Sequence, residues 1–243
     1  MSTRPTRSDS LGTLSIVACG LYSISLGLIF LYAPTERIEG DIQRMLYVHV
    51  PAALTMYLSY GLVFFASVMY LLRREARWDE LAAAAAEVGT VFTSTMIITG
   101  PLWAKPVWGT YWVWDARLTS AFVLWLIFIG YLMLRSYGGH AEQVARYCAV
   151  LAIIGFADLP IIHYSVRWWR TLHPDAKIMT EGSPGQGLEP PMLATFAVAF
   201  LATLLVFTLL LKLRLRMERQ QRRVDALQRE ITRPSAVVLG SAN

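Results

Sequence analysis

Six long apolar runs with few charged side chains restrict the fold of this sequence more than any other feature. A helix needs about 20 apolar residues to cross the hydrocarbon core of a bilayer. Six stretches come within a few residues of that length, at 11–33, 46–72, 81–102, 118–134, 147–165 and 191–211. The sequence therefore predicts an all-α, polytopic membrane protein with six transmembrane helices.

The composition agrees with this class. Hydrophobic residues make up 55% of the chain and charged residues 16%, whereas soluble domains carry about 25% charged residues. The two cysteines, Cys19 and Cys148, lie inside apolar runs without Cys-x-x-Cys spacing, so we interpret them as packing residues and expect neither a thiol-redox role nor a c-type cytochrome. The first run has no Ala-x-Ala cleavage site, so we expect a retained span.

The distribution of basic residues predicts the orientation. Fifteen of the 22 Lys and Arg residues fall on the side that holds both termini, and the positive-inside rule makes that side the cytoplasm. We divide the chain into a cytoplasmic arm (1–10), a membrane domain (11–211) and a basic cytoplasmic tail (212–243). For the tail, a helical extension at the anionic membrane surface is favoured over a nucleic-acid site, and docking of a cytoplasmic partner stays open. The Gly/Pro-rich stretch 181–191 is expected to be a mobile loop.

The predicted outer connection 102–117 is unusually aromatic. It holds four of the eight tryptophans of the chain and ends at a charged Asp-Ala-Arg sequence. Scattered tryptophans usually form an aromatic belt at the headgroups. Their clustering in one loop also fits a shaped platform for a flat, apolar ligand with a polar edge. Both interpretations stay open at this point.

The four histidines differ by position. His140 lies in a glycine-rich inner turn, and we expect His163, near the outer end of the fifth span, to be structural. His49 begins the second span, and His173 follows the fifth span by a few residues. Two histidines in different outer segments, on either side of a tryptophan-rich loop, fit axial ligation of a haem iron. Nearby guanidinium groups could pair with the haem propionates, namely Arg117, Arg167 and Arg170.

Several segments resemble one known family. WGTYWVWDARLTS resembles the tryptophan-rich signature of membrane proteins that handle haem in cytochrome c biogenesis. YVHVPAA, LPIIHYSVRWWRTLH and the six-span plan are similar to the cytochrome c maturation protein C family, also called haem exporter protein C (CcmC). The resemblance touches segments from 47 to 173. Tyr111 departs from it, because the signature often has a tryptophan there.

The resemblance implies a non-catalytic component that presents periplasmic haem to a membrane-anchored haem chaperone of the CcmE type. By position, His49 and His173 take the two axial-ligand roles, with haem b as transient cargo. The haem platform and chaperone docking surface would consist of Trp103, Trp108, Tyr111, Trp112, Trp114 and Asp115.

The same resemblance implies partners and a location. The partners are an ATP-binding-cassette transporter with CcmA-like and CcmB-like subunits and a small single-span protein of the CcmD type, within the lipid bilayer and without nucleic acid. The implied location is the bacterial inner membrane, with multiple spans and periplasmic functional loops.

Three rival functions make different demands on the sequence. A transmembrane electron carrier of the b-cytochrome type needs facing histidines at mid-membrane depth, whereas His49 and His173 fall at or beyond span ends. A permease needs charged or broken-helix features at mid-bilayer, for which Asp158 is the one strong candidate. Larger haem-lyase relatives have more spans and further intramembrane histidines.

Overall fold

The computed structural model describes residues 9–173 and 188–232, and all of its regular elements there are helices. They are α1 (Asp9–Gly27), α2 (Leu46–Arg73), α3 (Ala76–Trp108), α4 (Ala116–Tyr137), α5 (Ala141–Phe156), α6 (Asp158–Trp168) and α7 (Pro190–Thr232). A π-helical turn, η1 (Leu28–Tyr32), extends α1, and a 3₁₀ turn, η2 (Asp41–Met45), precedes α2. Within the described ranges, six helical segments are long and apolar enough to cross a membrane. The predicted fold class is confirmed.

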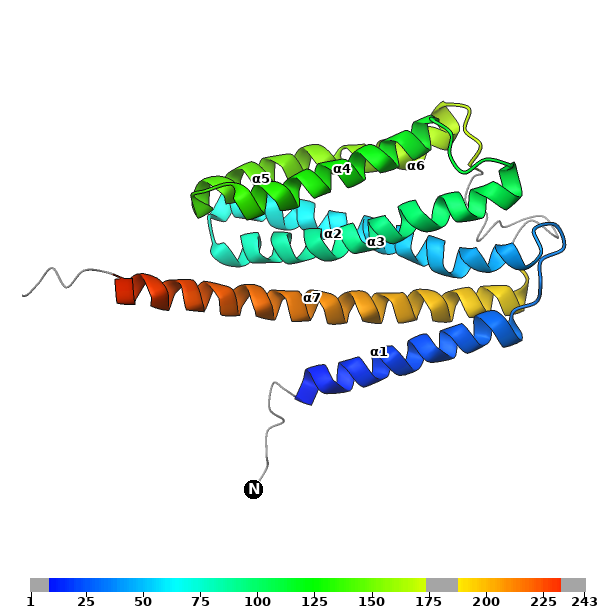
Figure 1. The fold of residues 1–243 in the computed structure, drawn as a ribbon, viewed down its shortest axis with the longest axis horizontal. Helices are drawn as coiled ribbons and strands as arrows, with labels where there is room; N and C mark the ends of the chain where they lie inside the picture. Colours follow the sequence, from blue (N-terminus) through cyan, green and yellow to red (C-terminus); the bar gives the residue numbers. More distant parts are fainter. Residues whose placement is uncertain (1–8, 174–187, 233–243) are drawn as a thin grey trace, which may run out of the picture.

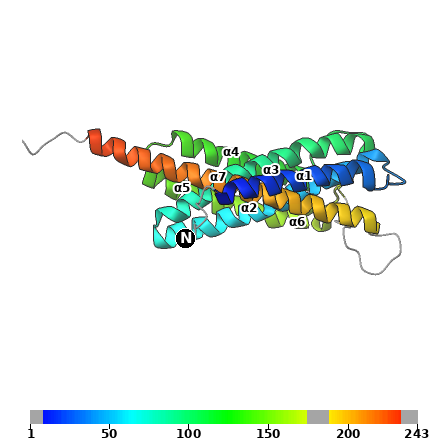
Figure 2. The same cartoon turned by 90° about the horizontal axis from the view of Figure 1, so that it is seen from below.

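The helices form an elongated bundle in layers (Figure 1). The α2–α3 hairpin lies in the middle, with α4, α5 and α6 on one side and α7 on the other. Helix α1 packs against α7 as the outermost layer, as both views show (Figures 1 and 2). Because the helices alternate in direction, the turns α3–α4 and α4–α5 lie at opposite ends of the bundle.

Close packing of small and aromatic residues holds the central layer together. Gly89 of α3 lies against α2, where a methyl group on its Cα atom would come within 2.6 Å of Ser59 Oγ and 2.9 Å of Tyr60 Cε1. The Tyr60 ring stacks on Phe128 of α4 at 3.7 Å, and its hydroxyl lies 2.8 Å from Thr93 Oγ1. Small residues allow this approach, as is common where helices meet inside a bilayer.

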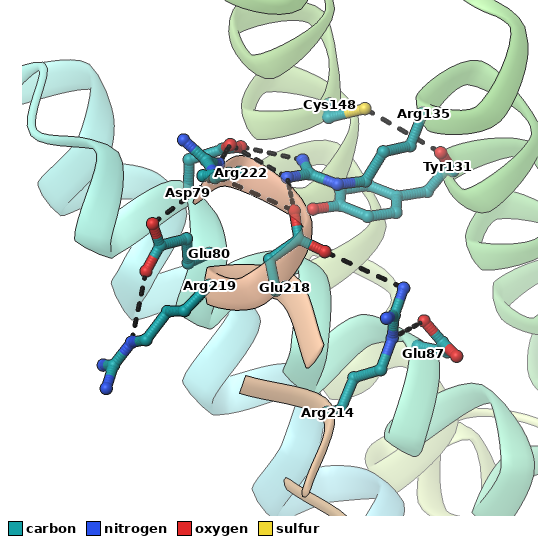
Figure 3. A network of polar contacts seen from close by, with 10 residues as sticks. All are labelled: Asp79, Glu80, Glu87, Tyr131, Arg135, Cys148, Arg214, Glu218, Arg219 and Arg222. Atoms are coloured by element: carbon teal, nitrogen blue, oxygen red, sulfur yellow. Dashed lines mark hydrogen bonds and ion pairs between the residues drawn. The ribbon is translucent and has the colours of Figure 1, made fainter. Parts of the chain in front are cut away.

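An ion-pair network ties α7 to α3 and α4 (Figure 3). It lies near the beginning of α3 and the end of α4, which is the end of the bundle opposite to the tryptophan-rich segment. Arg135 donates two hydrogen bonds of 2.8 Å to the carboxylate of Asp79, and Arg222 of α7 donates a third of 2.6 Å. Arg214 of α7 pairs with Glu87 of α3. These contacts hold the basic extension of α7 against the bundle.

The ends of two predicted spans differ from the sequence prediction. Helix α3 continues through two prolines to Trp108, six residues beyond the expected end of the span. The fifth span breaks at Ala157 into α5 and α6, because Pro160 in the first turn of α6 has no N–H to donate. Helix α7 runs without interruption from Pro190 to Thr232, so the tail is helical from 212 to 232, as the sequence analysis expected. Most of the expected mobile loop lies outside the described residues.

Candidate functional site

His49 lies in the first turns of α2 and faces the last turns of α3. Its Nδ1 atom is 3.0 Å from Thr99 Oγ1. Its ring meets the Trp103 ring edge to face, with centroids 5.8 Å apart and planes at 76°. Gly100 lies beside the ring as well, since a methyl group there would be 3.3 Å from His49 Cε1. Three residues near the end of α3, Thr99, Gly100 and Trp103, therefore contact this histidine.

The connection between α1 and α2 supports Trp103. Glu39 accepts a hydrogen bond of 2.9 Å from the Trp103 indole N–H. The connection is itself ordered by Glu36, whose carboxylate accepts the backbone N–H groups of Ile38 and Glu39 at 2.6 and 2.5 Å. These bonds, the one from Glu39 above all, hold the pKa of Glu36 below its ordinary value. The sequence analysis missed Glu39, because nothing in the local sequence indicates its partner.

A glycine cap and an aspartate cap shape the tryptophan-rich segment. Gly109 ends α3 in the left-handed conformation (φ 77°) that favours glycine, and its N–H bonds to the Lys105 carbonyl at 3.0 Å. After an extended stretch, Asp115 caps α4 by accepting the N–H of Leu118 at 2.8 Å. The other carboxylate oxygen of Asp115 accepts the N–H of Leu172 at 3.3 Å. Asp115 therefore joins the tryptophan-rich segment to the chain that carries His173.

His173 lies near the same end of α3 as His49. Its ring meets that of Trp108, the last residue of α3, with centroids 6.1 Å apart and planes at 66°. His49 interacts electrostatically with both His173 and Arg117. The structure thus brings together two histidines that are far apart in the sequence, each against a tryptophan of one helix.

An apolar pocket lies beside this arrangement. It is open, has a volume of about 270 Å³ and is lined by Ile97, Pro101, Trp112, Trp114 and Phe122. The rings of Trp112, Trp114 and Phe122 pack edge to face, with centroids 5.6 to 6.2 Å apart. The Trp112 indole nitrogen is buried and has no hydrogen-bond partner among the described residues. The pocket offers flat apolar contacts, and Phe122 is a contributor that the sequence analysis missed.

Tyr111 and two of the predicted arginines are more exposed than the residues around the two histidines. The Tyr111 side chain is 57% exposed, with the Lys105 ammonium 5.3 Å from its ring centre. Arg167 and Arg170 are exposed near the end of α6 and form no ion pair with any residue that the structure describes. His163 is exposed on α6, where its ring contacts Tyr164.

The two histidines suit the iron of a haem, which already has four porphyrin nitrogen ligands, better than a bare metal ion. In the described ranges, no three His, Cys, Asp or Glu side chains gather into a group that could hold a bare metal ion. His49 and His173 would supply two imidazoles for the iron of a haem, and the neighbouring indoles would supply flat apolar contacts for its ring. The residues present therefore fit the group that the sequence analysis expected.

Comparison with known proteins gives a consistent result. A family model described as Heme exporter protein C matches residues 5–230. Heme exporter protein C of Bradyrhizobium diazoefficiens is 38% identical over 216 residues, which cover 89% of this chain and 79% of the relative. The Escherichia coli K12 protein of the same name is 36% identical over 187 residues, covering 77% and 74%. A ccmC-like mitochondrial protein of cytochrome c biosynthesis from Marchantia polymorpha is 35% identical over 190 residues, covering 78% and 81%.

Proposed function

The chain belongs to the heme exporter protein C family, and on that premise we propose that it holds haem between His49 and His173 and passes it to a haem chaperone. Membership confirms the predicted family and makes the chain a multi-pass, haem-handling membrane protein of cytochrome c biogenesis rather than an enzyme. The ligands, the receiving partner and the face of the membrane are the parts that we propose.

The observation that carries the proposal is the placement of the two histidines at one end of α3. His49 comes from α2 and His173 from the chain after α6, so they approach from separate elements. They interact electrostatically and contact Trp103 and Trp108 of the same helix. Ligation of an iron from both sides of a ring requires donors on separate elements.

The aromatic segment supplies the second part of the proposal. Trp112 and Trp114 line an open apolar pocket, and Trp114 is 74% exposed. An exposed indole beside a half-buried one, in a segment held at both ends by the Gly109 and Asp115 caps, suits a docking surface for a flat ligand or a partner protein. Arg117, which lies close enough to interact with His49, is the propionate contact best supported by the structure, ahead of the outlying Arg167 and Arg170.

Family membership and the charge bias support the remaining proposals. We place this end of the bundle in the periplasm of the bacterial inner membrane, because most Lys and Arg residues fall at the other end. The proposed receiver is a CcmE-like haem chaperone. The proposed assembly partners are CcmA-like and CcmB-like transporter subunits and a CcmD-like single-span protein.

Ligation is tested by absorbance spectra of the full-length protein purified with its haem. His49→Ala or His173→Ala should lose or shift the haem bands, and added imidazole should restore part of them by filling the vacant axial position. His163→Ala is the matched control, because its exposed ring on α6 lies outside the proposed site. A spectrum that survives His49→Ala but disappears in His163→Ala would reverse the assignment.

A further inference from the structure

The contact between His49 and Thr99 has a direction that follows from the remaining bonds of Thr99. A threonine hydroxyl has one hydrogen to donate and two lone pairs to accept with. The Thr99 hydroxyl donates to the backbone carbonyl of Thr95 at 2.7 Å. Other hydroxyls of α3 do the same one turn back, with Ser94 donating to Thr90 at 2.8 Å and Thr95 donating to Val91 at 3.1 Å.

The carbonyls of Thr95 at 2.7 Å and Met96 at 3.4 Å both lie within reach of the Thr99 hydroxyl. We assign its one hydrogen to the nearer carbonyl, that of Thr95, and with this assignment Thr99 Oγ1 accepts from His49. The hydrogen between them, across 3.0 Å, must then belong to His49 Nδ1. A neutral imidazole with its proton on Nδ1 has its free lone pair on Nε2. In the described part of the chain His49 Nε2 makes no hydrogen bond, so this lone pair remains available.

We propose that Thr99 is a positioning residue that selects the Nδ1–H tautomer of His49 and so presents Nε2 to the haem iron. The inference rests on the proposed function in one respect, namely that His49 is an axial ligand. Metal-binding histidines commonly donate their second N–H to a nearby acceptor, which sets both tautomer and ring orientation. Here the acceptor is a hydroxyl rather than a carboxylate, so it polarises the imidazole less, which suits a ligand that must release its cargo.

The surroundings of the ring hold it in the orientation that this bond requires. Gly100 leaves just enough room for His49 Cε1, and the Trp103 ring lies edge to face against it. Trp103 is in turn fixed by its bond to Glu39. Rotating the imidazole by half a turn would place a carbon against Thr99 and lose the hydrogen bond.

The inference is tested with the hydroxyl removed at nearly constant shape. Thr99→Val keeps the branched side chain without the acceptor, Thr99→Ser keeps the acceptor, and Thr99→Ala serves if the valine variant does not fold. Thr95→Val is the matched control, because the Thr95 hydroxyl lies one turn earlier on α3 and donates to the Val91 carbonyl rather than contacting His49. All variants are full-length protein in detergent.

Two measurements report on the proton and on the ligand. Nitrogen-15 spectra of histidine-labelled, haem-free protein, with the His49 signal assigned by its loss in His49→Ala, should show the Nδ1–H form in the wild type, Thr99→Ser and Thr95→Val. The signal should shift toward the Nε2–H form in Thr99→Val. In the haem-loaded protein, imidazole should displace the native ligand of Thr99→Val at a concentration lower by on the order of 10-fold.

The outcomes separate this inference from the proposed function. If Thr99→Val matches the wild type in both measurements while His49→Ala loses the haem bands, Thr99 has no positioning role and ligation by His49 stands. If Thr99→Ser and Thr95→Val are altered as much as Thr99→Val, the effect is packing and the inference is overturned. If His49→Ala keeps the wild-type haem bands, the proposed ligand assignment itself fails.

Discussion

Trp114 and Asp115 are neighbours in the aromatic segment, but their surroundings in the structure give them different roles. Trp114 is largely exposed and contacts the rings of Trp112 and Phe122, whereas Asp115 caps α4 and holds the backbone next to His173. We therefore expect Trp114→Ala to leave the thermal unfolding temperature unchanged while c-type cytochromes fail to mature. Protein level and cytochrome content measured in the same membranes check this. Disappearance of the variant from the membrane would favour the aromatic-belt interpretation instead.

Asp115 is expected to behave differently. Asp115→Ala removes an N-cap, which costs about 1 kcal/mol, and also frees the segment that carries His173. It should lower both the unfolding temperature and haem retention. Asp115→Asn is the control, because asparagine also caps helices well and should keep most of the stability. Equal loss in both variants would mean that the cap is not what matters, and that the charge or the second carboxylate oxygen, which accepts the N–H of Leu172, is needed.

At the scale of elements, the approach of α2 to α3 depends on Gly89. A methyl group there would overlap Ser59 and Tyr60, both of which are buried. Gly89→Ala should therefore separate the hairpin slightly and destabilise the protein by about 1 to 3 kcal/mol, measured as a lower unfolding temperature in detergent. Gly61→Ala on α2 is the matched control, since nothing lies within 4 Å of its methyl position. If both variants unfold alike, the α2–α3 contact is less tight than the structure indicates.

At the scale of the whole molecule, the network around Asp79 joins three helices. The Asp79 side chain is only 9% exposed and accepts bonds from Arg135 and Arg222. Removing its charge leaves two partly buried guanidinium groups short of a partner, at a cost of about 3 kcal/mol. Asp79→Asn should thus lower the unfolding temperature. Glu142→Gln, which breaks the exposed pair with Arg146, should not. A similar loss in both would show that burial does not strengthen the Asp79 network.

The orientation of the whole bundle is open to a direct test. Gly109 and Gly139 lie in turns at opposite ends of α4, so they must report opposite sides of the membrane. Basic residues concentrate at the Gly139 end, which predicts cytoplasm there and periplasm at Gly109. Reporter fusions at the two positions check this with the intact preceding helices in place. A cytoplasmic signal at Gly109 would place the aromatic site on the wrong face for periplasmic haem.

The sequence by itself determined the helical class, the six spans and the family, because bilayer thickness imposes a length on each apolar run and the motif segments are contiguous. It also indicated His49, His173 and the tryptophan-rich segment, whose residue types are unusual for their positions. It did not indicate that α3 would continue to Trp108, since prolines normally end a helix and neighbouring helices were needed to compensate.

Only the tertiary structure decided which residues support the site. The bonds from Trp103 to Glu39, between His49 and Thr99, and from Arg222 to Asp79 join residues 64, 50 and 143 positions apart. Each partner is an ordinary residue in its own segment, and its role arises from the way in which the helices align after they pack. Periodicity and composition describe one helix at a time, so they carry no information about which turn of one helix faces which turn of another.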